Sequence, residues 1–262
     1  MPAAASVSAA ALPSLSEQVE RLVAAGVHDL AGMSAGELRA AAPEDAAAGS
    51  LLVIHPARVP ASALAPLLSR DGHGGFVVSD MQDVDDFTAI ELSTPPAGAL
   101  YLVRGLDRGD GMRNWSPDEA LPAIAAAGSS PLTLVEGLHW LLQQPGILER
   151  NCCFMTVGSR LRRPNGSLDA RTPAIWISNG TGRDGRERRN APKVGWCWAG
   201  NRHTWLGFAS ASERMAVEAR PQRQPTAAGA ASSAAGAASS AAGAASSAAG
   251  APNSSVAGAD HL

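Results

Sequence analysis

Apolar positions in the N-terminal half of the chain repeat mostly at the spacing of a helix face. In the segment that follows Ser14, large apolar residues lie three or four positions apart, and Gly26 is a suitable helix end. The segment after Thr133 repeats this spacing. A helix there should end before Pro145, because the residue before a proline disfavours helical backbone. The spacing therefore predicts amphipathic helices near both ends of this half.

Four helix starts share one short motif, a Ser or Thr followed three residues later by Glu. In this motif the hydroxyl accepts a hydrogen bond from a first-turn N–H, while the carboxylate reaches back to the capping residue and favours the positive helix end. The four pairs are Ser14 with Glu17, Ser34 with Glu37, Ser116 with Glu119, and Thr133 with Glu136. Each pair predicts the N-terminus of a helix.

Short runs of β-branched, aromatic and other apolar residues predict strands, most of them in the C-terminal half. The predicted strands are residues 51–55, 76–79, 99–103, 152–157, 174–178, 193–198 and 203–208. A helix at 61–68 separates the first two, which allows one βαβ unit, whereas the last four follow one another without helices. The pattern predicts an α+β fold, with a helical N-terminal half and a β-rich C-terminal half.

Composition divides the chain into one globular domain with two low-complexity ends. Residues 1–13 and 216–262 are expected to be disordered, and residues 14–215 are expected to form a single α+β domain. From Ala227 an Ala/Gly/Ser sequence repeats every seven residues without a large apolar side chain, so it has nothing to bury in a coiled coil. The alanine-rich start has no basic residue and is too weakly apolar for a signal peptide or a membrane span.

Charge and cysteine content limit the cellular compartments and the classes of partner that we expect for this protein. The net charge is −3, yet the stretch from Arg160 to Lys193 carries a local excess of positive charge and includes the basic, glycine-rich loop 179–192. Because the whole chain is acidic, a solvated loop is a better interpretation than a nucleic-acid surface. The cysteines, Cys152, Cys153 and Cys197, are odd in number and have no metal-ligand spacing. We therefore expect reduced thiols in the cytoplasm, and no metal or cofactor.

The segment GWCWAGNRHTWLG, residues 195–207, contains three of the six tryptophans. Its Gly200-Asn201 dipeptide is a signal for a two-residue hairpin turn. A hairpin turning there would pair Trp198 with His203 and Trp196 with Trp205. Those four side chains would share one face of the hairpin, and Cys197 would point to the opposite face. This register argues against a metal or a catalytic dyad held by Cys197 and His203.

The aromatic face of this hairpin has two interpretations. It is either core beneath a helix layer or a half-open platform for stacking and cation–π contacts, which Trp176 could extend from a neighbouring strand. By distance from the turn, Trp196 and Trp205 are expected to form the core pair, and Trp198 is expected to be more open. The polar rim of the platform would be Asn201, Arg202 and His203.

These features favour a binding or interaction module for a small molecule or a protein partner. The alternative is a small hydrolase or transferase in which His203 is the general base and Ser159 or Cys153 lies nearby. A scaffold tethered to its partners by the tail is a third class. No G-x-S-x-G or Cys/His motif frames Ser159 or Cys153.

Three blocks of the sequence, RNCCFMTVGSR, PAIWISNG and PKVGWCWAGNRHTWLGFASAS, resemble an uncharacterised family of actinobacterial proteins. The resemblance is strongest in the GWCWAGNxHTWLG block and extends over most of residues 14–212. It implies no activity, cofactor or catalytic residue. The arginine-rich insert after Asn179 departs from the family pattern, which makes this insert a poor place to look for a shared function.

Overall fold

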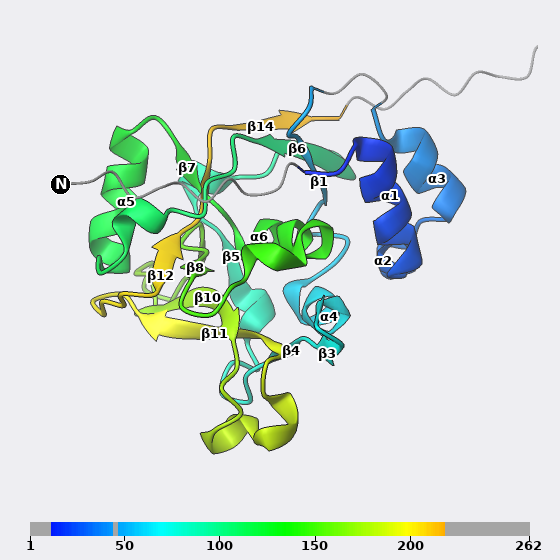
Figure 1. Ribbon diagram of the computed structural model, residues 1–262. Coiled ribbons are helices and arrows are strands. Elements are labelled where there is room, and N and C mark those ends of the chain that lie inside the picture. Colours follow the sequence, from blue (N-terminus) through cyan, green and yellow to red (C-terminus); the bar gives the residue numbers. More distant parts are fainter. Residues whose placement is uncertain (1–11, 44–46, 218–262) are drawn as a thin grey trace, which may run out of the picture. The chain divides into compact units, whose positions relative to one another are not determined.

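The computed structural model describes residues 12–43 and 47–217 (Figure 1). The sequence expectations for residues 1–11 and for 218–262, including the heptad repeat, lie outside the described residues. The α-helices are α1 (Leu15–Ala24), α2 (Val27–Leu30), α3 (Ala35–Ala41), α4 (Ala61–Leu64), α5 (Pro117–Ala126) and α6 (Leu134–Gln143). Short 3-10 turns are η1 (Ala65–Leu67), η2 (Val84–Asp86), η3 (Glu91–Ser93), η4 (Asp110–Met112), η5 (Pro145–Ile147), η6 (Gly182–Asp184) and η7 (Arg186–Arg188).

The four predicted helix starts are confirmed as the N-termini of α1, α3, α5 and α6. In each, the glutamate carboxylate accepts a hydrogen bond from the backbone N–H of the capping residue at 2.7–2.8 Å. The predicted ends also agree with the structure, since α1 stops at Ala24 before Gly26, whose φ is 72°, and α6 stops at Gln143 before Pro145. Local chemistry thus sets these boundaries.

The strands form two larger sheets and three two-stranded ribbons. The three-stranded sheet has the order β1-β6-β14, and the five-stranded sheet has the order β12-β8-β10-β11-β4. The ribbons are β13-β7, β2-β3 and β5-β9. The strands of the larger sheets are β1 (Leu51–Ile54), β4 (Phe76–Val77), β6 (Leu100–Arg104), β8 (Cys153–Met155), β10 (Arg171–Ile177), β11 (Pro192–Trp198), β12 (Leu206–Phe208) and β14 (Glu213–Ala216). Those of the ribbons are β2 (Ser69–Arg70), β3 (His73–Gly74), β5 (Phe87–Ala89), β7 (Ser130–Pro131), β9 (Ser159–Leu161) and β13 (Ser210–Ala211).

Helix α6 lies between the two larger sheets and is almost completely buried (Figure 1). A side chain at Gly137 would lie 2.8 Å from Thr156 and 3.3 Å from Ile175, so this glycine lets the helix approach the five-stranded sheet closely. On the other side, the His139 ring accepts a hydrogen bond from the Ile54 N–H of β1. The helix therefore joins the two sheets into one core, which confirms the α+β class.

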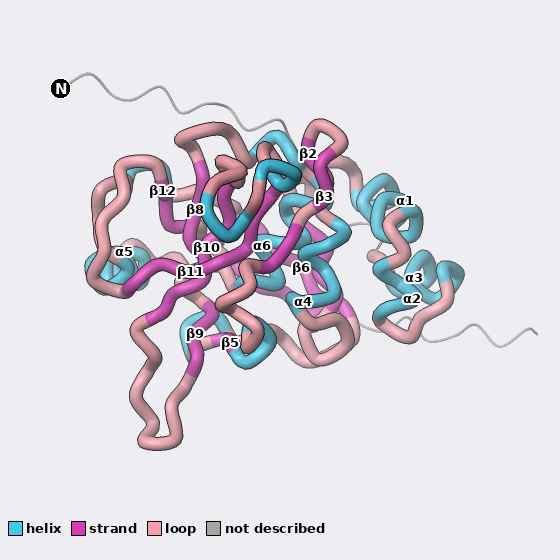
Figure 2. Tube along the Cα trace, turned by 90° about the horizontal axis from the view of Figure 1, so that it is seen from below, coloured by secondary structure: helices cyan, strands magenta, loops and turns pink. Residues whose placement is uncertain are grey.

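Two expectations about strand pairing are wrong. The strands at 51–54 and 76–77 belong to different sheets, so they form no βαβ unit. The strands at 192–198 and 206–208 do not pair either, and the predicted hairpin does not exist. Strand β11 lies between β10 and β4 (Figure 1), while β12 lies at the opposite edge of the sheet beside β8 (Figure 2).

The hairpin is lost because β11 has a better partner elsewhere. It pairs with β10 over seven consecutive residue pairs, from Arg171 with Trp198 to Ile177 with Pro192. The connection after β11 does not fold back on the strand. Instead, the Ala199 and His203 carbonyls accept hydrogen bonds from the Asp118 and Asn114 N–H groups.

Candidate functional site

The predicted aromatic cluster divides into two groups on opposite faces of the five-stranded sheet. Trp198 pairs with Arg171 in the β10–β11 register, whereas Trp176 is five residues further along β10 and pairs with Lys193. Because side chains alternate along a strand, Trp198 and Trp176 leave opposite faces. The expectation of a single aromatic platform on one face is therefore wrong.

The first group is the tryptophan pair, Trp196 and Trp198. Their rings meet edge to face, with centroids 4.6 Å apart and an interplanar angle of 69°. Trp198 is 48% exposed, one of the largest exposures of any large apolar side chain in the described residues, and Trp196 is half-buried. The expectation that Trp198 is more open than Trp196 and Trp205 is confirmed. The expected core pair of Trp196 and Trp205 is wrong, because Trp196 contacts Trp198 and Trp205 contacts Trp176.

Arg171, which is paired with Trp198 across the two strands, is held in place by several contacts. Its guanidinium donates two hydrogen bonds to the Asp83 carboxylate, at 3.0 and 2.7 Å, and one to Asp169 at 3.1 Å. It also lies over the Phe87 ring, with its central carbon 5.3 Å from the ring centroid. These contacts raise the pKa of Arg171 further and fix the strand position opposite Trp198.

The rim residues Asn201 and Arg202 lie in the exposed connection after β11. The Asn201 N–H donates to the Trp198 carbonyl, which closes a turn. Arg202 donates to the Asn114 carbonyl at 2.9 Å and forms an ion pair with Glu119. The next residue after Asn114 is Trp115, which is 40% exposed. The two segments that carry exposed tryptophans are therefore bonded to each other.

The second group is an aromatic cluster of Trp176, Trp205 and His203. The Trp176 and Trp205 rings are 6.3 Å apart in a T-shaped arrangement, and the His203 ring lies 5.3 Å from Trp205. All three residues are half-buried. Burial lowers the pKa of His203, and its Nε2 atom is buried without a hydrogen-bond partner in the described part of the chain.

The residues proposed to work with His203 have structural roles. The Ser159 hydroxyl accepts a hydrogen bond from the Leu134 N–H at 2.9 Å and so helps to cap α6. The Cys153 thiol donates to the Glu149 carbonyl, and burial raises its pKa to about 11, which makes it a poor nucleophile at neutral pH. Neither side chain is poised for the hydrolase or transferase alternative.

The arginine-rich loop folds over a small cavity of about 130 Å³. Three of the positive groups that line this cavity already have partners, and Arg183 contacts the Asp80 carboxylate at 3.5 Å. Lys193 contacts the Asp184 carboxylate at 2.8 Å and lies 5.0 Å from the Trp176 ring centroid, and Arg188 stacks over Phe76. The positive charges beside this cavity are therefore already engaged within the protein.

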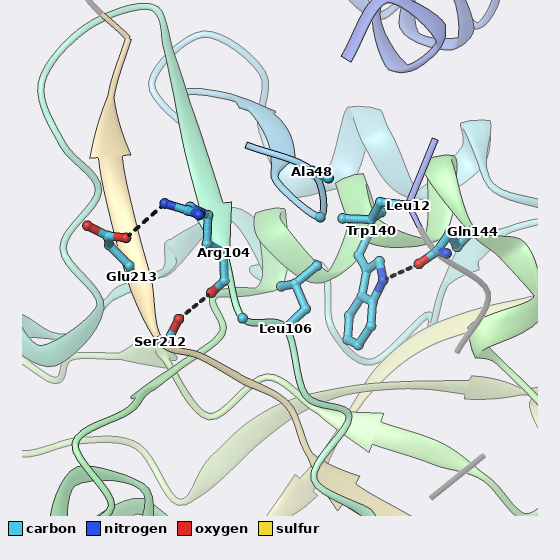
Figure 3. Close-up of a pocket in the computed structure, with 10 residues that line it drawn as sticks. Leu12, Ala48, Arg104, Leu106, Trp140, Gln144, Ser212 and Glu213 are labelled. Atoms are coloured by element: carbon cyan, nitrogen blue, oxygen red, sulfur yellow. Dashed lines mark hydrogen bonds and ion pairs between the residues drawn. The ribbon is translucent and has the colours of Figure 1, made fainter. Parts of the chain in front are cut away.

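A larger cavity, of about 580 Å³, was not expected from the sequence (Figure 3). Its walls include Leu12, Arg104, Leu106, Trp140, Gln144 and Glu213. They come from the start of the domain, the end of β6, helix α6 and the last strand. Because these positions are scattered along the chain, no local motif marks them.

Comparison with known proteins gives a family but no activity. The chain belongs to DUF5701, a family of unknown function, whose model matches residues 21–217. This match confirms the resemblance to an uncharacterised family. No curated protein and no solved structure matches the chain.

Neither a metal centre nor a membrane-spanning helix is found among the described residues. No group of three or more His, Cys, Asp and Glu side chains there is arranged to hold a metal ion. None of the helices described is both long and apolar enough to cross a membrane.

Proposed function

We propose that this protein is a cytoplasmic binding module whose ligand surface is the tryptophan pair, with Asn201 and Arg202 at its rim. The observation that carries the proposal is the exposure of Trp198, a large indole held in place by Trp196 and left almost half open to water. Exposed, rigidly held tryptophans offer a large stacking surface at a small entropic cost.

The surroundings of Trp198 support a ligand with a planar or apolar group. The Trp196 ring holds the Trp198 indole from one side, and the hydrogen-bonded Arg171 anchors the neighbouring strand. Because the indole is already ordered, binding a ligand costs little conformational entropy. The half-exposed Arg202 lies in the same connection and supplies a donor at the edge. Trp176, Trp205 and His203 are assigned to the opposite face, where they contribute to packing.

The proposal is tested by fragment binding, monitored by NMR through the indole N–H signals. The probes are indole, benzoate, benzylammonium and adenosine, which share a ring and differ in charge. We expect at least one probe to shift the Trp198 signal, with the charge series showing which head group Arg202 favours. In Trp198→Ala this binding should disappear.

Leu92 supplies a matched control, because it is another large apolar side chain, 51% exposed, on a different segment. Leu92→Ala should bind the probes as the wild type does. The proposal fails if no probe shifts Trp198, or if Trp198→Ala binds every probe as tightly as the wild type.

A further inference from the structure

The 580 Å³ cavity is independent of the tryptophan pair and has the size of a small-molecule site, which typically spans about 300–1,000 Å³. Leu12, Leu106 and Trp140 form its apolar wall, and Arg104 and Glu213 stand at another side of it (Figure 3). The Trp140 ring is fixed by a hydrogen bond from its Nε1 to Gln144 at 2.8 Å. The cavity therefore joins an apolar wall to a charged rim.

The charged groups at the rim, Arg104 and Glu213, make only a weak contact with each other. Arg104 and Glu213 are cross-strand neighbours on β6 and β14, with Nη1 and Oε2 3.6 Å apart, which is beyond hydrogen-bond distance. Their side chains are 37% and 53% exposed. In the described part of the chain the Arg104 guanidinium donates no other hydrogen bond. An exposed pair of this kind contributes little to stability, so the guanidinium is free to turn to a better acceptor.

The backbone keeps this rim in place. The Arg104 carbonyl accepts hydrogen bonds from the N–H and the hydroxyl of Ser212, at 2.9 and 3.1 Å. Gly105 follows with φ of 62°, and a side chain there would lie 2.2 Å from the Ser212 hydroxyl. The strand ends that carry Arg104 and Glu213 are thus held at a close, fixed separation.

We propose that this cavity binds a small amphipathic carboxylate, with the carboxylate on Arg104 and the apolar body against Leu12 and Leu106. A planar guanidinium matches a carboxylate with two parallel hydrogen bonds, which Glu213 does not provide here. The apolar wall accounts for the rest of the ligand, since its burial removes hydrocarbon from water.

Isothermal titration of the full chain with octanoate, octanol and octyltrimethylammonium tests the assignment. Octanoate should bind one to one, and the alcohol and the cation should bind at least about tenfold more weakly. Arg104→Gln should weaken octanoate binding about tenfold and leave octanol unchanged. Glu213→Gln should leave octanoate binding intact or strengthen it, because it removes the competing carboxylate.

Leu106→Trp, which fills the cavity, should abolish binding of all three probes, with folding checked by its denaturant midpoint. Arg39→Gln, which breaks an exposed ion pair with Glu20, should change nothing. Trp198→Ala should also leave octanoate binding unchanged, which separates this site from the tryptophan pair. The assignment is overturned if octanoate does not bind, or if it binds Arg104→Gln or Leu106→Trp as tightly as the wild type.

Discussion

Trp198 packs edge to face against Trp196, two residues earlier on the same strand, with the ring centroids 4.6 Å apart. Both side chains leave the same face of β11 because strand residues alternate. Strand β4 pairs with β11 only at Lys193 and Val194, so the end of β11 that carries the two rings extends past its edge partner. The contact therefore orders an indole that the sheet itself leaves open.

The buried ion pair between Glu136 and Arg214 is expected to be the most sensitive charged contact in the domain. Both side chains are buried, and they are joined by two hydrogen bonds of 2.6 and 2.7 Å. Arg214→Met leaves the Glu136 charge buried and uncompensated, so we expect it to destabilise the fold by about 3–5 kcal/mol in urea unfolding.

A matched exposed pair provides the control for this prediction. Arg39→Met breaks the contact with Glu20 on the surface and should lower the stability far less than Arg214→Met does. Adding Glu136→Gln to Arg214→Met should recover part of the lost stability, because the buried charge is then removed. If Arg214→Met and Arg39→Met lower the stability equally, the buried pair contributes no more to stability than the exposed one.

Acid should destabilise the protein through His139. Complete burial lowers the pKa of His139 from 6.5 to about 4, so in the folded state the ring stays neutral where the unfolded chain binds a proton. Proton binding then favours unfolding: the contribution of the neutral ring is complete above pH 6.5 and is lost as the pH falls towards 4. At 1.36 kcal/mol per pH unit this amounts to roughly 3 kcal/mol.

The measurement compares the wild type with His139→Gln by urea unfolding at pH 7 and pH 4.5. Carboxylates titrate alike in both proteins, so their effect cancels in the difference. The stability advantage of the wild type should shrink by roughly 2–3 kcal/mol at the lower pH. A difference that does not change with pH would mean that His139 is not the group responsible.

The thiols of Cys153 and Cys197 should resist alkylation in the folded protein. Burial raises the pKa of each to about 11, so almost none of the reactive thiolate is present near neutral pH. Mass spectrometry after iodoacetamide treatment at pH 7.5 should find both unmodified in buffer and modified in guanidinium chloride. Rapid labelling of Cys197 in buffer would instead identify an activated thiol beside the aromatic residues.

Local signals predicted the helices well. The Ser–Glu and Thr–Glu pairs act within one helical turn, so their geometry is contained in a few consecutive residues, and all four helix starts are confirmed. The approximate positions of the strands are also local, because apolar runs such as residues 51–55 and 193–198 must be buried wherever they pair.

Strand pairing could not be predicted in the same way. A Gly200-Asn201 turn favours a hairpin locally, but seven residue pairs with β10 outweigh it, and the partner is separated from β11 by a long loop. The expectation that Trp198 is open is confirmed, but the reason is not its distance from a hairpin turn. Its exposure follows from its place at the end of β11. The large cavity had no sequence signal, because Leu12, Arg104 and Trp140 meet only through the fold.

The most direct test of the platform is the cost of removing Trp198, measured by denaturant unfolding at constant m. Because this indole is nearly half exposed, Trp198→Ala should cost about 1–2 kcal/mol, counting the lost contact with Trp196. Trp140→Ala, which removes an indole only 3% exposed, should cost about 3–5 kcal/mol. If Trp198→Ala destabilises the protein as much as Trp140→Ala does, Trp198 is core and the proposed binding surface does not exist.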